Sequence, residues 1–199
     1  RAGIETTYGL TFKRPLAHLR EYVLILKAIL QTGSVEFSGQ FYQANTRMPG
    51  PVDVPVLISA LQRGSFELAG AEADGAITWV CPGEYLRNVA LPAMKYGADQ
   101  AGRAVPPLVT HAPVCVHDNR SESLSASREQ LGFYPRAPFY AQMFADAGFL
   151  IEGVQGEGDE FMTGRVQPGD LPQEIRADVE NLNRRLSSSL GPVRFEWVH

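Results

Sequence analysis

Residues 55–79 read PVLISALQRGSFELAGAEADGAITW. An apolar run over 54–60 predicts a strand that is buried on both faces. A helix over 65–73 separates this run from a second apolar strand over 76–80. Two buried strands joined by a helix indicate parallel pairing through a right-handed crossover. Ligands of such sheets bind beyond the carboxyl ends of the strands, so the turn at 60–64 is the first candidate for a site.

The rest of the chain continues this alternation. Leucine and valine at spacings of three and four predict an amphipathic helix over 14–33, and a β-hairpin is expected over 34–45. The further expected elements are helices over 82–103 (broken near Pro92), 121–134, 135–149 and 171–191, and strands over 106–118 and 192–198. A TIM barrel needs about eight strands, and only four of barrel type are expected. We therefore predict an α/β fold of the (β/α)8 TIM-barrel type, with residues 1–199 forming a single domain from its C-terminal part and the N-terminal strands missing.

The composition argues against several classes of protein. The net charge is -4, whereas a nucleic-acid-binding protein normally has a basic face. No apolar run approaches the roughly 18 residues that span a bilayer, and no secretory signal is visible, so we expect a cytoplasmic protein. The four histidines and two cysteines are not spaced as metal ligands, so no metal site is expected.

The turn at 60–64 is suited to an anion. Ala60 is small, Gly64 relaxes the turn, and the N–H groups at the start of the next helix attract negative charge. Arg63 adds a cation for a phosphate. Two interpretations stay open at this point, a site for a phosphate or cofactor tail and an ordinary strand-to-helix turn with a solvated arginine.

Aromatic residues supply the other candidates. Trp79, near a strand end, either walls a pocket or packs in the core. The segment 138–144 contains Phe139, Tyr140 and Met143, which form either part of the core or a lid over an apolar substrate. His111 is expected near the start of its strand, away from the active-site end of a barrel, and we interpret it as structural.

Several segments, taken together, resemble a known family. They are YGLTFKRPLAHLREYVLILKAIL, VEFSGQFY, PVLISALQRGSFELAGAEADGAITW, PLVTHAPVCVHD and FYPRAPFYAQMFADAG. In register they resemble the C-terminal part of the bacterial luciferase-like superfamily, and most of all its actinobacterial deazaflavin-dependent (coenzyme F-420) oxidoreductases. The resemblance covers nearly the whole chain and weakens after about Gly164. It implies a (β/α)8 barrel whose members pass hydride through a flavin or deazaflavin, some as monooxygenases that use reduced FMN and oxygen.

The resemblance also implies roles for individual residues. The positions that match the loop holding the phosphate-bearing tail of the cofactor are Ala60, Leu61, Gln62, Arg63 and Gly64. Trp79 matches a position on the substrate side of the ring, and Phe139 and Tyr140 fall near the active-site mouth. Leu61 and Gln62 replace small residues of relatives, which leaves the backbone fewer ways to wrap a phosphate. The acid/base residues of the family lie in the N-terminal part, so the catalytic residues are unknown and this chain alone is expected to be inactive.

We therefore expect an oxidoreductase that transfers hydride via coenzyme F-420 or FMN to or from a small organic substrate. The alternatives are an FMN-dependent monooxygenase that uses oxygen and a non-catalytic, flavin-binding or oligomer-forming relic of the fold. No nucleic-acid or membrane partner is expected. Because half a barrel exposes apolar strand edges, we expect the chain to form a homodimer or to bind a complementing N-terminal segment.

Overall fold

The computed structural model describes residues 7–9, 13–111, 113 and 118–149. The helix expected over 171–191 and the strand expected over 192–198 lie outside the described residues. The chain divides into two compact units, which are treated separately below. The first unit comprises Arg1–Thr78 and Val89–Thr110, and the second comprises Trp79–Asn88 and His111–His199. The prediction of a single domain over 1–199 stays a prediction.

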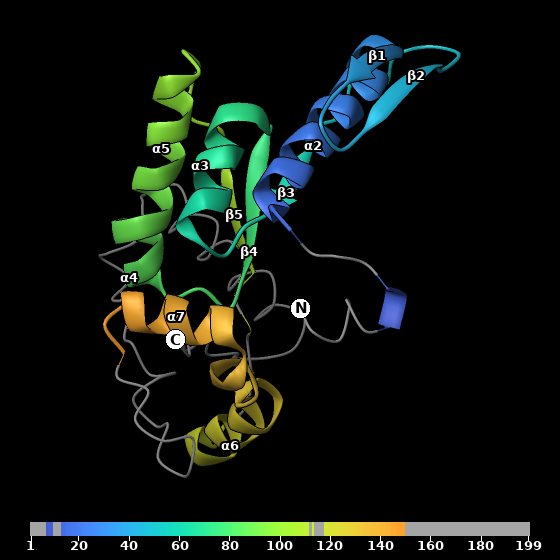
Figure 1. The fold of residues 1–199 in the computed structure, drawn as a ribbon. Helices are drawn as coiled ribbons and strands as arrows, with labels where there is room; N and C mark the ends of the chain where they lie inside the picture. The colour runs from blue at the N-terminus through green and yellow to red at the C-terminus, as the bar shows by residue number, and fades with distance from the viewer. Residues whose placement is uncertain (1–6, 10–12, 112, 114–117, 150–199) are drawn as a thin grey trace, which may run out of the picture. The chain divides into compact units, whose positions relative to one another are not determined.

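The first unit begins with the predicted helix and hairpin (Figure 1). Helix α2, Pro15–Thr32, has a proline in its first turn and ends at Gly33, whose φ of 77° is in the left-handed region that glycine adopts readily. Strands β1, Ser34–Ser38, and β2, Gln43–Arg47, pair antiparallel. Both predictions are therefore confirmed.

A single carboxylate ties the hairpin to α2. Glu21 accepts hydrogen bonds from the amides of Gln40 and Phe41, both at 2.8 Å, and of Tyr42 at 3.0 Å. Desolvation alone would raise the pKa of Glu21, but these three hydrogen bonds, aided by the nearby His18, outweigh it and lower the pKa below its ordinary value. The turn of the hairpin is thus fixed both by a residue of the helix and by its own hydrogen bond from the Gly39 amide to the Tyr42 carbonyl at 2.9 Å.

A three-stranded sheet forms the centre of the first unit. It contains β3, Leu57–Ser59, β4, Gly75–Trp79, and β5, Leu108–His111, in the order β3-β4-β5. Strands β3 and β4 are parallel, with Ile58 opposite Ala76. The amide of Ala76 donates to the carbonyl of Pro107, and the hydroxyls of Thr78 and Thr110 lie 2.7 Å apart. These contacts advance together along both strands, so β5 runs in the same direction.

The three strands differ in length and burial from those predicted. Strand β3 starts at Leu57 rather than at 54, because Pro55 has no amide hydrogen and the amide of Val56 donates to a carboxylate of Asp74. Strand β4 ends at Trp79 because Val80 has a φ of 54°. Strand β5 ends at His111 and is largely exposed, whereas a buried strand over 106–118 was expected.

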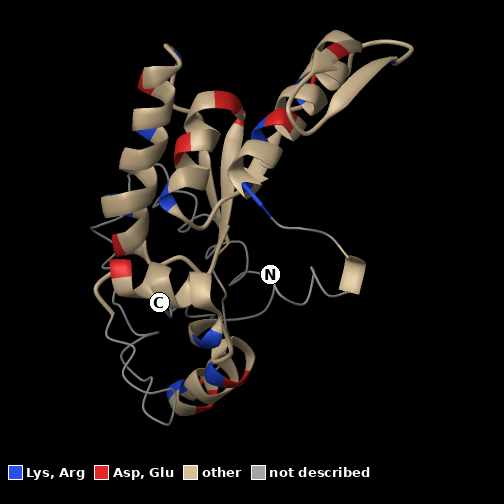
Figure 2. Ribbon diagram, viewed as in Figure 1, with Lys and Arg blue, Asp and Glu red and all other residues tan. Residues whose placement is uncertain are grey.

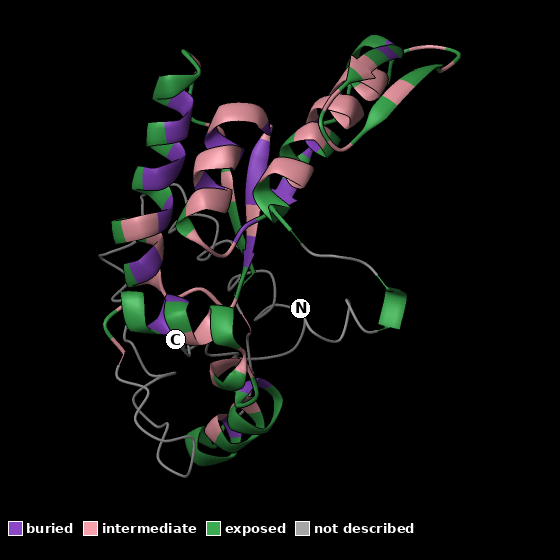
Figure 3. Ribbon diagram, viewed as in Figure 1, coloured by how far each residue is buried: buried purple, intermediate pink, exposed green. Residues whose placement is uncertain are grey.

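Two helices pack against one another beside this sheet. They are α3, Arg63–Glu72, and α5, Leu91–Gln100. Figure 3 shows buried residues on β4 and along α5. A Cβ atom on Gly70 would lie 2.0 Å from the carbonyl oxygen of Met94, and one on Gly97 would lie 1.9 Å from that of Glu67. The two helix backbones therefore touch directly, and only glycine fits at either position.

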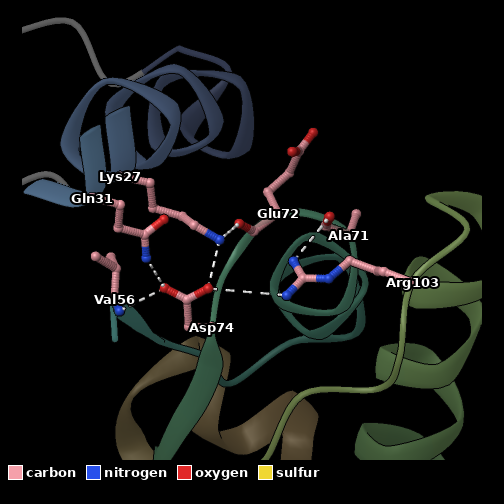
Figure 4. Close-up of polar contacts among 7 residues, drawn as sticks. All are labelled: Lys27, Gln31, Val56, Ala71, Glu72, Asp74 and Arg103. Carbon is pink, nitrogen blue, oxygen red and sulfur yellow. Dashed lines mark hydrogen bonds and ion pairs between the residues drawn. The ribbon is translucent and has the colours of Figure 1, made fainter. Parts of the chain in front are cut away.

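A cluster around Asp74 joins α2 to the sheet (Figure 4). One carboxylate oxygen lies 2.6 Å from Lys27 Nζ, and the other accepts from Gln31 Nε2 at 2.8 Å and from the Val56 amide at 2.9 Å. The Nη2 atom of Arg103 lies 4.0 Å from the first oxygen. Desolvation alone would raise the pKa of Asp74, but these hydrogen bonds and the charge of Lys27 outweigh it and lower the pKa.

The segment before α5 and the second unit contain the remaining elements. A short helix α4, Gly83–Tyr85, leads into a π-helical turn, η1, Leu86–Ala90, and Pro92 lies in the first turn of α5, which confirms the predicted break. The second unit continues with α6, Arg120–Leu131, a 3-10 turn η2, Tyr134–Arg136, and α7, Pro138–Asp146. Asn119 caps α6 by accepting from the Ser121 amide at 3.0 Å. None of the described helices is long and apolar enough to cross a bilayer.

The helix contact gives a prediction about stability. Gly70→Ala and Gly97→Ala should each lower the free energy of unfolding by about 1–3 kcal/mol, because the added methyl group meets backbone that cannot move aside. The loss should appear despite the better helix propensity of alanine. Urea denaturation measures it, with Gly83→Ala as the control, since a Cβ there meets nothing within 4 Å. Equal midpoints for all three variants would contradict the direct backbone contact.

The Asp74 cluster gives a prediction about pH. Asp74→Asn should cost about 1.5–3 kcal/mol at neutral pH, the range for hydrogen bonds to a charged group. The folded-state pKa of Asp74 lies below its ordinary value, so the stabilisation is complete above that ordinary value and is lost as the pH falls through the folded-state pKa. The difference between the two proteins should therefore shrink below about pH 4. Urea titrations over this range measure it.

The control for this prediction is Asp99→Asn. Asp99 is exposed and pairs with Lys95 one turn away on α5 at 2.7 Å. Such a surface pair contributes roughly 0.3–0.5 kcal/mol. If the two variants lose the same stability, or if the Asp74 difference does not depend on pH, the Asp74 carboxylate does not hold α2 to the sheet as described.

Candidate functional site

The turn between β3 and α3 is closed by its own side chains. The Ala60 side chain is buried, and its amide donates to the carbonyl of Ile77 at 3.0 Å, so it continues the sheet. The hydroxyl of Ser65 accepts from the amides of Leu61 and Gln62, both at 3.2 Å, and donates to the carbonyl of Gln62 at 2.6 Å. Gln62 and Ser65 form a capping box. The turn therefore has a defined shape that needs no ligand.

The start of α3 is the part of this turn that can hold an anion. The Ser65 amide already donates to the carbonyl of Gln62 at 2.9 Å and, in the capping box, to the Gln62 side chain. The amides of Arg63 and Gly64 are left to meet a ligand, and no acidic residue lies in the first turn. The guanidinium of Arg63 is 71% exposed and pairs with Glu67 at 2.9 Å. Figure 2 shows the basic colour at the beginning of α3 and the acidic colour further along it. Because an exposed pair of this kind is worth only about 0.3–0.5 kcal/mol, Arg63 can exchange Glu67 for a ligand at little cost.

Gly64 has a packing role in addition to its place in the turn. A Cβ atom there would lie 2.7 Å from Cδ1 of Leu16 on α2. The glycine thus lets α2 approach the start of α3. The prediction that the five residues from Ala60 to Gly64 hold a phosphate-bearing tail stays a prediction.

In the second unit, Trp79 belongs to a chain of aromatic contacts. Its side chain is 39% exposed, which excludes the alternative of a fully packed core tryptophan. The indole Nε1 donates to the hydroxyl of Tyr134 at 2.6 Å, and the ring of His111 meets it edge-on at 5.7 Å. The next residue, Val80, is in the left-handed region, which costs an L-amino acid about 1–2 kcal/mol and is unusual for a β-branched side chain.

The chain of aromatic contacts continues into α7. Tyr134 meets Tyr140 at 4.7 Å between ring centroids, and Tyr140 meets Phe144 at 6.3 Å. Burial raises the pKa of Tyr140, and so do the neighbouring Tyr134 and Cys81, so that its hydroxyl stays protonated. We call Trp79, His111, Tyr134, Tyr140 and Phe144 the aromatic cluster.

The other two residues predicted for the substrate pocket, which are one helical turn apart on α7, differ in burial. Phe139 is 59% exposed, whereas Met143 is fully buried. The structure thus brings Trp79 and Tyr140 together through Tyr134, and it leaves Phe139 on the surface. Their role as a substrate pocket stays a prediction.

Sequence reasoning placed one residue of the cluster wrongly and missed another. His111 was expected near the start of a strand over 106–118, but it is the last residue of β5, Leu108–His111. Residues 112 and 114–117 of the predicted strand lie outside the described residues. Tyr134 stands at the end of the helix predicted over 121–134, whereas the structure places it in the 3-10 turn η2. Its only sequence signal is the Tyr-Pro pair, which ends the helical pattern and begins a 3-10 turn. Among the described residues, no group of three or more His, Cys, Asp or Glu side chains could hold a metal ion.

Comparison with known proteins identifies the family. A model of the family described as luciferase-like monooxygenase matches residues 1–175. The chain belongs to this family. An uncharacterised protein of Mycobacterium tuberculosis is 28% identical over 166 residues, which are 75% of this chain and 49% of the relative. The 5,10-methylenetetrahydromethanopterin reductase of Archaeoglobus fulgidus is 26% identical over 140 residues, covering 66% and 42%. The chain spans about half the length of the curated relatives it matches.

Solved structures of the same family share the fold. The coenzyme F-420-dependent tetrahydromethanopterin reductase from Methanopyrus kandleri has a TM-score of 0.56 at 19% identity, over 67% of this chain and 44% of that one. An F-420-dependent secondary alcohol dehydrogenase, solved in complex with an F-420-acetone adduct, has a TM-score of 0.59 at 19% identity, over 73% and 48%. The fold of this luciferase-like chain is therefore of the TIM-barrel type, as predicted.

Proposed function

We propose that this luciferase-like chain belongs to an oxidoreductase that transfers hydride between coenzyme F-420 and a small, uncharged organic substrate. The family membership supports an oxidoreductase, and the observation that favours F-420 over FMN is that both compared structures are F-420-dependent. The similar protein of Archaeoglobus fulgidus is named as a reductase, which also supports redox chemistry. The substrate class named here is likewise part of the proposal.

The start of α3 fits an anionic part of such a cofactor. It offers the amides of Arg63 and Gly64, the exposed guanidinium of Arg63 and no acidic residue in the first turn. The amides of Leu61 and Gln62 are bonded to Ser65, so they shape the turn instead of wrapping the ligand. We therefore assign Arg63 to hold one anionic group and Gly64 to bring the helix start close to it. When bound, the deazaflavin would accept or donate the hydride, and Arg63 would orient the tail of the cofactor.

Binding titrations test this proposal. The chain is titrated with coenzyme F-420 and, separately, with FMN, and cofactor fluorescence reports binding. Arg63→Ala should weaken F-420 binding about 10- to 100-fold, the equivalent of a hydrogen bond to a charged group. The control is Arg87→Ala, because Arg87 is likewise exposed and pairs with a nearby glutamate, Glu84. An unchanged affinity in Arg63→Ala would refute the assigned role, and failure of both cofactors to bind would favour the non-catalytic relic.

The description of the family favours a second candidate, an FMN-dependent monooxygenase. This candidate differs from the first in consuming oxygen. Preferential binding of FMN, together with oxygen uptake in the presence of reduced FMN and a substrate, would replace the F-420 proposal.

A further inference from the structure

The hydrogen bond between Trp79 and Tyr134 leaves one proton unassigned. An indole N–H can only donate, so in the 2.6 Å contact the hydroxyl oxygen of Tyr134 is the acceptor. The hydroxyl keeps its own proton, and among the described residues this proton has no recorded acceptor. Because the contact between Trp79 and Tyr134 is exposed, this proton is available to water or to the oxygen of a ligand that displaces the water.

The surroundings of this hydroxyl suit a neutral molecule. The rings in contact with Trp79 and Tyr134 belong to His111, Phe133 and Tyr140, so this hydroxyl lies beside aromatic surface. Tyr140 is kept protonated by the burial described above. Exposed aromatic surface remains on Trp79 and Phe133, so a ligand can reach the cluster.

The backbone conformation next to Trp79 indicates that the surrounding structure holds this residue in place. Val80 is β-branched, yet it is held at a φ of 54° immediately after the last residue of β4. Strained residues of this kind persist where the surrounding structure fixes them, and they concentrate at functional sites. The strain, the indole hydrogen bond and the edge-on contact with His111 together fix the orientation of the Trp79 ring.

We propose that Tyr134 is a specificity-determining residue, whose hydroxyl, oriented by Trp79, donates to the carbonyl or alcohol oxygen of a small neutral substrate lying against the indole. This inference rests on the proposed function and deepens it, because it names the substrate class. Trp79 has two tasks in this arrangement, since it supplies an apolar wall and fixes which way the Tyr134 proton points. A hydrocarbon of the same shape lacks the acceptor and binds less tightly.

The first experiment asks whether the hydrogen bond exists, independently of any activity. The chain has two tryptophans, so a Trp197→Phe background leaves Trp79 as the only indole. In the full-length chain, the indole N–H resonance of Trp79 should shift upfield and exchange faster in Tyr134→Phe, which keeps the ring and removes the hydroxyl. Tyr96→Phe, an exposed tyrosine on α5, is the control and should change nothing. An unchanged indole resonance in Tyr134→Phe would overturn the proposal.

The second experiment measures specificity with two probes of matched shape, cyclohexanone and methylenecyclohexane. Quenching of Trp79 fluorescence reports binding with and without coenzyme F-420. The parent chain should prefer the ketone by roughly two- to tenfold, the worth of one neutral hydrogen bond, and Tyr134→Phe should abolish this preference with little effect on the hydrocarbon. An indole shift without a loss of ketone preference would show that the bond is only structural and would overturn the proposal.

The two proposals fail in distinguishable ways. If F-420 does not bind but the ketone preference depends on Tyr134, the proposed cofactor is wrong and the specificity assignment stands. If F-420 binding depends on Arg63 and Tyr134→Phe leaves the ketone preference intact, the proposed cofactor stands and the specificity assignment is wrong. Where turnover of a ketone is measurable, Tyr134→Phe should raise KM more than it lowers kcat, because the hydrogen bond is made in the bound substrate.

Discussion

The carboxylate of Asp74 is the interaction on which the first unit depends. It binds the side chains of Lys27 and Gln31 on α2 and the amide of Val56 just before β3. The Asp74 amide in turn donates to the carbonyl of Val56. One residue therefore fixes where β3 begins, where β4 follows, and how α2 lies against both. Because the turn at 60–64 comes three residues after the start of β3, the location of the candidate anion site also depends on this carboxylate.

The contact between α3 and α5 makes this arrangement rigid. At Gly70 and Gly97 the two helices meet backbone to backbone, so no flexible side chain separates them. The start of α3 is consequently carried by a helix that is held on one side by α5 and near its beginning by Leu16 of α2. Rigid support of this kind is what a site needs if a guanidinium is to meet an anion in one defined place.

Local patterns predicted most helices and strands. Contacts between residues that are distant in sequence decide strand bounds and side-chain partners, which the sequence could not show. The apolar spacing of α2 and the glycine at 33 are local signals, and both were sufficient. The late start of β3 depends on an aspartate 18 residues away, and the partner of Trp79 lies 55 residues away. No spacing rule links such pairs. The turn at 60–64 was found from the order of strand and helix, but the capture of its amides by Ser65 was not foreseen, because a serine in the first turn has several possible partners.

The closure of that turn by Ser65 has a consequence for molecular recognition. A loop that must order itself around a ligand loses conformational entropy on binding, at a cost that is subtracted from the affinity. Here the amides of Leu61 and Gln62 already have acceptors, so the backbone is ordered in advance. Such a turn is preorganised, but these two amides cannot also donate to a ligand. Most of its attraction for an anion then comes from one exposed guanidinium and a helix end, and dissolved salt therefore weakens this attraction.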